Sequence, residues 1–193
     1  MRLLLAILLC GLSTAAGAVE LGGAMFESAM AVGGEDTVLN GAGLRRILLF
    51  KAYAIGLYLP RHEASLEQVL SERGPKRLRI VLLRDLEAER ISGTIEVGLH
   101  RNLGDAEFRA LHNRVEMLRR AIHETGKASA GAVIHLDWLP RVGAGVTRLT
   151  VDGVRRGQDI PGEDFYHSLL KVWLGPQVND PPLRDTLLGR EPS

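Results

Sequence analysis

Apolar runs of strand length alternate with amphipathic stretches along this chain of 193 residues. The run ILLFKAYAIGLYLP, residues 47–60, is apolar and partly aromatic and has no charge after Lys51, which predicts a buried strand that ends at Pro60. Residues 76–86 begin with polar and apolar residues in alternation and then become continuously apolar, as is typical of a central strand. Two further strands and a hairpin turn are expected at 133–138, 146–151 and Asp152-Gly153.

Apolar residues spaced three and four positions apart predict helices between and after these strands. In the helix that begins at Asp105, one apolar stripe is formed by Phe108, Leu111, Val115, Leu118 and Ile122. Other helices are expected over 65–73, over about 87–99, from Asp164 to Gly175 and from Pro181 to Gly189. Because strands and helices come in groups rather than in strict alternation, we expect an α+β fold with a large, mainly antiparallel sheet and a layer of helices.

The first 18 residues have the pattern of a secretory signal peptide. Arg2 gives a short positive segment, an apolar core follows from Leu3 to Leu12, and Ala16-Gly17-Ala18 has the A-x-A form that signal peptidase cleaves. The apolar core is too short to span about 30 Å of hydrocarbon as a helix, so no stable membrane anchor is expected. We therefore predict a signal peptide at 1–18 and a periplasmic or secreted single domain at 19–193.

Composition and motif content narrow the chemistry of that domain. Cys10 is the only cysteine and lies in the predicted signal, where Leu9 does not fit a lipoprotein motif, so disulfides and cysteine-ligated metals are not expected. The chain has 24 Lys+Arg and 23 Asp+Glu, and this balance gives no reason to expect a nucleic-acid partner. The segment GAGLRR has arginine where a dinucleotide-binding loop needs its third glycine, and neither a G-x-S-x-G nor an HExxH motif occurs. The six histidines never stand four residues apart, so we predict neither a metal nor a cofactor.

Three stretches together resemble the chalcone isomerase-like family, specifically its exported bacterial branch. They are residues 39–60, with the pattern GAG-x-R and YAIGLYL, residues 78–124, and residues 151–189, with the helix stops WLG and LLG. The resemblance covers nearly the whole predicted mature chain and implies the family's fold. In that fold a large antiparallel sheet packs against a layer of helices, with an apolar ligand cleft between them.

Two residues of the first stretch are the main candidates for ligand binding. Arg45 matches the family's arginine, and a guanidinium that follows a glycine-rich turn beside a buried strand needs an anionic partner, because burying it unpaired costs several kcal/mol. That partner is a ligand carboxylate or phenolate or, alternatively, an acidic residue such as Glu35 or Asp36. Tyr53 stands where the plant enzymes have threonine and where the fatty-acid-binding members have tyrosine. The alternative for Tyr53 is a core tyrosine bonded to the backbone.

The helix after Asp105 differs from the plant chalcone isomerases. Where those enzymes have tyrosine, lysine and asparagine, the alignment puts Phe108, Leu111 and Val115, so this helix is expected to line an apolar tail pocket without catalytic donors. In the last long helix, Ser168 is a further candidate for contact with a ligand.

These residues favour an exported, non-catalytic protein that binds a small lipophilic anion such as a fatty acid, with no cofactor. A phenolic ligand fits the same residues. An intramolecular lyase or isomerase acting on a phenolic or enone substrate is the second hypothesis, with Arg45 as electrophile and Tyr53 as acid. A third hypothesis is an envelope assembly or accessory protein whose cleft is vestigial.

Overall fold

The computed structural model describes residues 17–47 and 50–191, so the predicted signal sequence lies almost wholly outside the described residues. Its centre is a seven-stranded sheet in the order β11-β10-β9-β6-β5-β4-β3, and every neighbouring pair is antiparallel. The strands are β3 (Ala29–Val32), β4 (Glu35–Ile47), β5 (Phe50–Leu59), β6 (Lys76–Leu82), β9 (Val133–Leu139), β10 (Val146–Val151) and β11 (Val154–Pro161).

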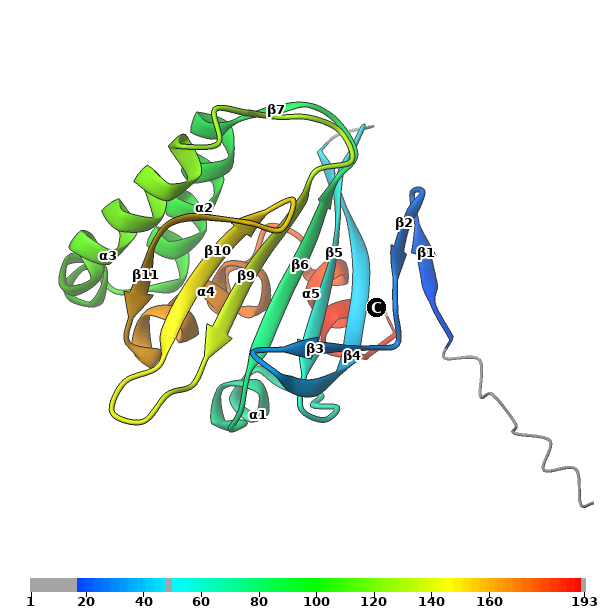
Figure 1. Ribbon diagram of the computed structural model, residues 1–193, viewed down its shortest axis with the longest axis horizontal. Helices are drawn as coiled ribbons and strands as arrows, with labels where there is room; N and C mark the ends of the chain where they lie inside the picture. The colour runs from blue at the N-terminus through cyan, green and yellow to red at the C-terminus, as the bar shows by residue number, and fades with distance from the viewer. Residues whose placement is uncertain (1–16, 48–49, 192–193) are drawn as a thin grey trace, which may run out of the picture.

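Five helices are described: α1 (Leu66–Ser71), α2 (Ala88–Asn102), α3 (Asp105–His123), α4 (Glu163–Leu174) and α5 (Pro181–Leu187). In Figure 1, α4 and α5 lie behind the sheet and α3 lies beside β11, and α2 packs against α3 and α4. Each predicted helix is present, including the short α1, where the Ser65 hydroxyl accepts a hydrogen bond from the Gln68 amide at 3.2 Å. The expected α+β fold with an antiparallel sheet and a helical layer is confirmed.

Apolar side chains pack on both faces of the sheet, in agreement with the strand period of two. Along β5, Ile55, Leu57 and Leu59 are buried in the large core beneath the helices, whereas Ala54 and Tyr58 belong to a smaller cluster on the other face. On that second face, a hairpin made of β1 (Val19–Leu21) and β2 (Ala24–Phe26) covers part of β4, β5 and β6. A two-stranded ladder of β7 (Leu86–Glu87) and β8 (Lys127–Ala128) joins the start of α2 to the segment after α3.

The glycine-rich segment before Arg45 is part of a strand and not the turn that we expected. The predicted strand over 47–60 corresponds to β5 from Phe50 onward, and Ile47 instead ends β4, which contains GAGLRR. A Cβ on Gly41 would collide with the backbone of α5 at Thr186. The glycine therefore allows helix α5 to approach the sheet closely, which is a packing role that composition alone does not distinguish from a turn.

No helix within residues 17–47 and 50–191 is long and apolar enough to cross a membrane.

Candidate functional site

A cavity of about 760 Å³ lies between the sheet and helix α2. Its lining is mainly apolar, and its floor is formed by side chains from three successive strands of the sheet: Ile80, Leu82, Ile134, Leu136, Leu149 and Val151. The volume falls in the range of roughly 300–1,000 Å³ that is usual for small-molecule sites. Because residues of β4 and of β10 both line it, the cavity crosses four strand spacings, or roughly 19 Å. This shape suits a long, narrow apolar ligand.

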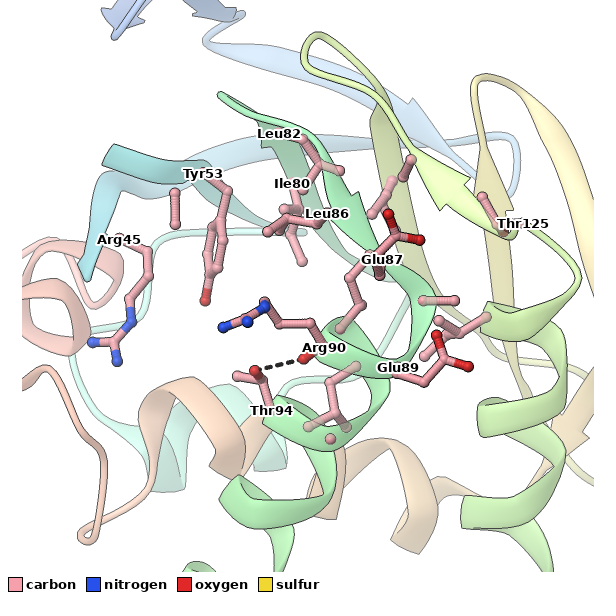
Figure 2. A pocket seen from close by; sticks show the side chains of 18 of the residues that line it. Arg45, Tyr53, Ile80, Leu82, Leu86, Glu87, Glu89, Arg90, Thr94 and Thr125 are labelled. Atoms are coloured by element: carbon pink, nitrogen blue, oxygen red, sulfur yellow. Dashed lines mark hydrogen bonds between the residues drawn. The ribbon is translucent and has the colours of Figure 1, made fainter. Parts of the chain in front are cut away.

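Arg45 and Tyr53 lie together at the β4 end of this cavity (Figure 2). They are direct partners in the antiparallel β4–β5 register, so their side chains share the helix-facing side of the sheet. The register shifts immediately afterwards, and Arg46 is not among the residues that line the cavity. The structure therefore brings together the two principal candidates that the sequence indicated.

The guanidinium of Arg45 already has an acidic partner. Its Nη1 atom donates to the Asp180 carboxylate at 2.9 Å, and both side chains are only partly exposed, at 19% and 24%. Asp180 also accepts a hydrogen bond from the Leu183 amide at 3.2 Å and so caps helix α5. The acids named from the sequence, Glu35 and Asp36, lie about 30 Å away at the other end of β4. A sequence reading cannot find Asp180, because the pair joins positions 135 residues apart.

Tyr53 is held by a side chain and not by the backbone. The Trp173 indole N–H on α4 donates to its hydroxyl oxygen at 2.9 Å. Burial raises the pKa of the Tyr53 phenol, although the Trp173 hydrogen bond and the Arg45 charge oppose that rise. The phenol is therefore neutral at neutral pH, and its proton is available to a ligand oxygen.

The predicted contribution of α3 to the cavity has to be corrected. Leu111 and Val115 are buried in the core, Phe108 stacks on His100 with ring centroids 3.6 Å apart, and none of the three lines the cavity. Helix α3 packs against α2 and β11, so its apolar stripe faces other elements of the fold. An amphipathic pattern identifies a buried face but not the element that covers it.

Ser168 also lies outside the cavity lining. Its hydroxyl is buried and donates to the Asp164 carbonyl at 2.8 Å within α4. A serine hydroxyl bonded in this way to the preceding turn of its own helix already has a hydrogen-bond partner. This position of Ser168 therefore does not support contact with a ligand.

Helix α2 covers the cavity instead, and it carries polar side chains that the sequence reading did not select. Glu87 at the N-cap of α2 and Arg90 and Thr94 within the helix recur at spacings of three and four residues, and all three line the cavity beside Ile91 and Ile95. The Thr94 hydroxyl donates to the Arg90 carbonyl at 2.8 Å. The helix that lines the cavity is therefore α2 and not the expected helix after Asp105, and α2 brings polar donors to it. The sequence does show polar residues three and four positions apart at the start of the predicted helix over 87–99. This spacing puts them on one face of the helix, but only the packing of α2 over the sheet shows that this face lines the cavity.

Within the described residues, no three His, Cys, Asp or Glu side chains are grouped so that they could hold a metal ion.

Comparisons with known proteins agree with this architecture. A fatty-acid binding protein of Arabidopsis thaliana, known from a crystal structure, superposes with a TM-score of 0.69 at 15% identity, over 89% of this chain and 96% of that one. At this identity the likeness shows a common fold and nothing finer. A search of curated protein sequences finds no match. The family model described as chalcone isomerase-like matches residues 18–189, which is most of the chain. The chain thus belongs to the chalcone isomerase-like family.

Proposed function

We propose that this protein binds a long-chain carboxylic acid, such as a fatty acid, without transforming it. The observation that carries the proposal is the elongated apolar cavity with Arg45 and Tyr53 paired at one end. An alkyl chain on the floor strands would bury apolar surface at about 25 cal/mol per Å², and the acid group would meet hydrogen-bond donors at the β4 end. The fold shared with a plant fatty-acid binding protein is consistent with this use of the cavity.

The first experiment measures binding of dodecanoate and hexadecanoate to delipidated protein by isothermal titration calorimetry. A cavity-blocking variant, Ile80→Trp, places a large ring in the middle of the floor and is expected to abolish binding. The matched control is Val154→Trp, which adds the same ring at an exposed position on β11, outside the cavity. Thermal unfolding establishes that both variants fold. Absence of fatty-acid binding by the wild-type protein would contradict the proposal.

We further propose that the protein works outside the cytoplasm after cleavage near Ala18. The support is the signal-like sequence of residues 1–18. Mass spectrometry of the protein recovered from the periplasm and the medium tests this, since cleavage predicts a chain that begins at Val19. Recovery of an uncleaved chain in the cytoplasm alone would contradict it.

An intramolecular lyase or isomerase is the second candidate, and the polar side chains on α2 favour it. A neutral Tyr53 hydroxyl and the guanidinium groups of Arg45 and Arg90 all belong to the lining, and donors of this kind can polarise a substrate carbonyl. Turnover of a chalcone above the uncatalysed rate, lost in Arg45→Ala, would support this candidate. Turnover equal to background in the wild-type protein would eliminate it for that substrate.

A further inference from the structure

Two guanidinium groups face the β4 end of the cavity. Arg45 reaches it from the sheet, and Arg90 reaches it from α2 (Figure 2). In Figure 2 the Arg90 side chain extends across the cavity toward Tyr53, whereas the carboxylates of Glu87 and Glu89 lie on the other side, nearer Thr125. The two arginines are chemically equal, but their surroundings differ.

The charge of Arg45 is compensated before any ligand arrives. Its ion pair with Asp180 is short and partly buried, and the same carboxylate holds the first turn of α5. A ligand acid that displaced Asp180 would also remove that cap and leave the aspartate unpaired near the cavity. Arg45 can donate its remaining N–H groups to a ligand, but it contributes little net positive charge.

Arg90 has no such partner. Among residues 17–47 and 50–191, no ion pair or hydrogen bond involves its guanidinium, and the side chain is exposed. The nearby Glu89 carboxylate lies 3.5 Å from His123 on α3, so it is directed away from Arg90. Arg90 therefore brings the uncompensated positive charge to this end of the cavity.

We propose that Arg90, and not Arg45, supplies the charge that binds the acid group of the ligand, and that this end is matched to a monoanion. The inference rests on the proposed fatty-acid binding. Arg45 and Arg90 with Asp180 leave one net positive charge, which a single carboxylate neutralises and a phosphate dianion exceeds. Arg45 and Tyr53 complete the site as hydrogen-bond donors.

The test titrates dodecanoate and its methyl ester into four proteins: wild type, Arg90→Gln, Arg45→Gln and Arg101→Gln. Arg101 is the matched control, because it is an exposed arginine on the same helix outside the cavity. Arg90→Gln is expected to weaken the binding of dodecanoate by about tenfold or more and to leave the affinity for the methyl ester unchanged. The loss of dodecanoate affinity is expected to be larger in Arg90→Gln than in Arg45→Gln. Arg90→Lys, which retains the charge, is expected to recover much of the affinity.

A fifth variant, Asp180→Asn, tests the compensation directly. Asparagine still caps a helix, but it no longer neutralises Arg45, so the cavity end gains one net positive charge. Binding of dodecanoate is expected to strengthen by several-fold, and dodecyl phosphate is expected to gain more than dodecanoate.

The outcomes separate this inference from the function on which it rests. If the wild type binds dodecanoate and Arg90→Gln binds it equally well while Arg45→Gln does not, the role of Arg90 is overturned and fatty-acid binding stands. If the wild type binds neither dodecanoate nor its ester, both proposals fail. If dodecyl phosphate binds the wild type more tightly than dodecanoate does, the match to a monoanion is wrong.

Discussion

The indole N–H of Trp173 donates to the hydroxyl oxygen of Tyr53 across 2.9 Å, and this bond ties helix α4 to strand β5 at the wall of the cavity. Because the indole can only donate, the Tyr53 oxygen acts as acceptor and its own proton remains free for another partner. The bond thus fixes the position of the phenol ring and directs its remaining donor capacity to a ligand.

Removing the Tyr53 hydroxyl is expected to affect both stability and affinity. In Tyr53→Phe the buried Trp173 N–H loses its acceptor, at a cost of about 1–3 kcal/mol in the free energy of unfolding. Loss of a donor to a carboxylate should weaken fatty-acid binding by about tenfold. Urea denaturation and calorimetric titration measure the two effects.

Tyr58→Phe is the matched control for that experiment. The Tyr58 hydroxyl donates to the Glu27 carbonyl at 3.0 Å on the opposite face of the sheet. We expect a comparable loss of stability and unchanged affinity. Equal losses of affinity in the two variants would show that Tyr53 acts only through the stability of the fold.

The sequence could predict most of the helices and strands, because those conclusions depend on local spacing, whereas Arg45 and Tyr53 were indicated by the resemblance to a known family. Strand and helix periodicities are local properties, but the antiparallel pairing that sets Arg45 beside Tyr53 was not predicted, because residues 47–60 were expected to form one strand after a turn. The resemblance of residues 39–60 to a known family then indicated which of many arginines to consider.

The partners from distant segments could not be predicted in this way. Asp180 reaches the site from the loop before α5 and Trp173 reaches it from α4, across separations of 135 and 120 residues. Helices α2 and α3 have similar amphipathic sequences, and only the packing of α2 over the sheet decides that Arg90, and not Phe108, faces the cavity.

Ligand length should depend on the β10 end of the cavity. Leu149 lies on β10, four strand positions from Arg45 on β4, and is 5% exposed. Leu149→Trp fills that end and is expected to weaken hexadecanoate binding at least tenfold, while octanoate, which does not extend so far, keeps its affinity. Competition between hexadecanoate and octanoate, run once with the wild type and once with Leu149→Trp, measures the change in their relative affinities. Equal losses for both acids would indicate that the tryptophan distorts the whole cavity.

Two glycines, one in strand β4 and one in helix α2, should respond oppositely to substitution by alanine. In Gly41→Ala the new methyl meets the backbone of α5, so we expect a loss of at least about 1–3 kcal/mol in unfolding free energy. Gly93 lies within α2 and a Cβ there meets nothing within 4 Å, so Gly93→Ala should stabilise the helix by about 0.5–1 kcal/mol. Denaturant midpoints at a constant m-value test both. A neutral Gly41→Ala would mean that α5 can withdraw from the sheet without cost.

His135 gives the fold a predictable weakness toward acid. Burial lowers the pKa of its imidazole to about 4, with the Arg77 and Arg79 charges acting in the same direction and Asp137 opposing them. Its Nε2 atom is also buried without a hydrogen-bond partner among the described residues.

The sign of the effect follows from proton binding. Between an ordinary value of about 6.5 and the lowered value, the unfolded chain binds a proton at His135 that the folded chain does not. The stabilising contribution is therefore complete above about pH 6.5 and is lost as the pH falls toward 4. His135→Gln should reduce the dependence of unfolding free energy on pH in that window by at most about 1.4 kcal/mol per pH unit, and by less where solvent reaches the ring.

Urea denaturation at several pH values measures this dependence on pH. The exposed His62→Gln serves as control, and an unchanged slope in His135→Gln would show that the imidazole is protonated equally in the folded and unfolded chains.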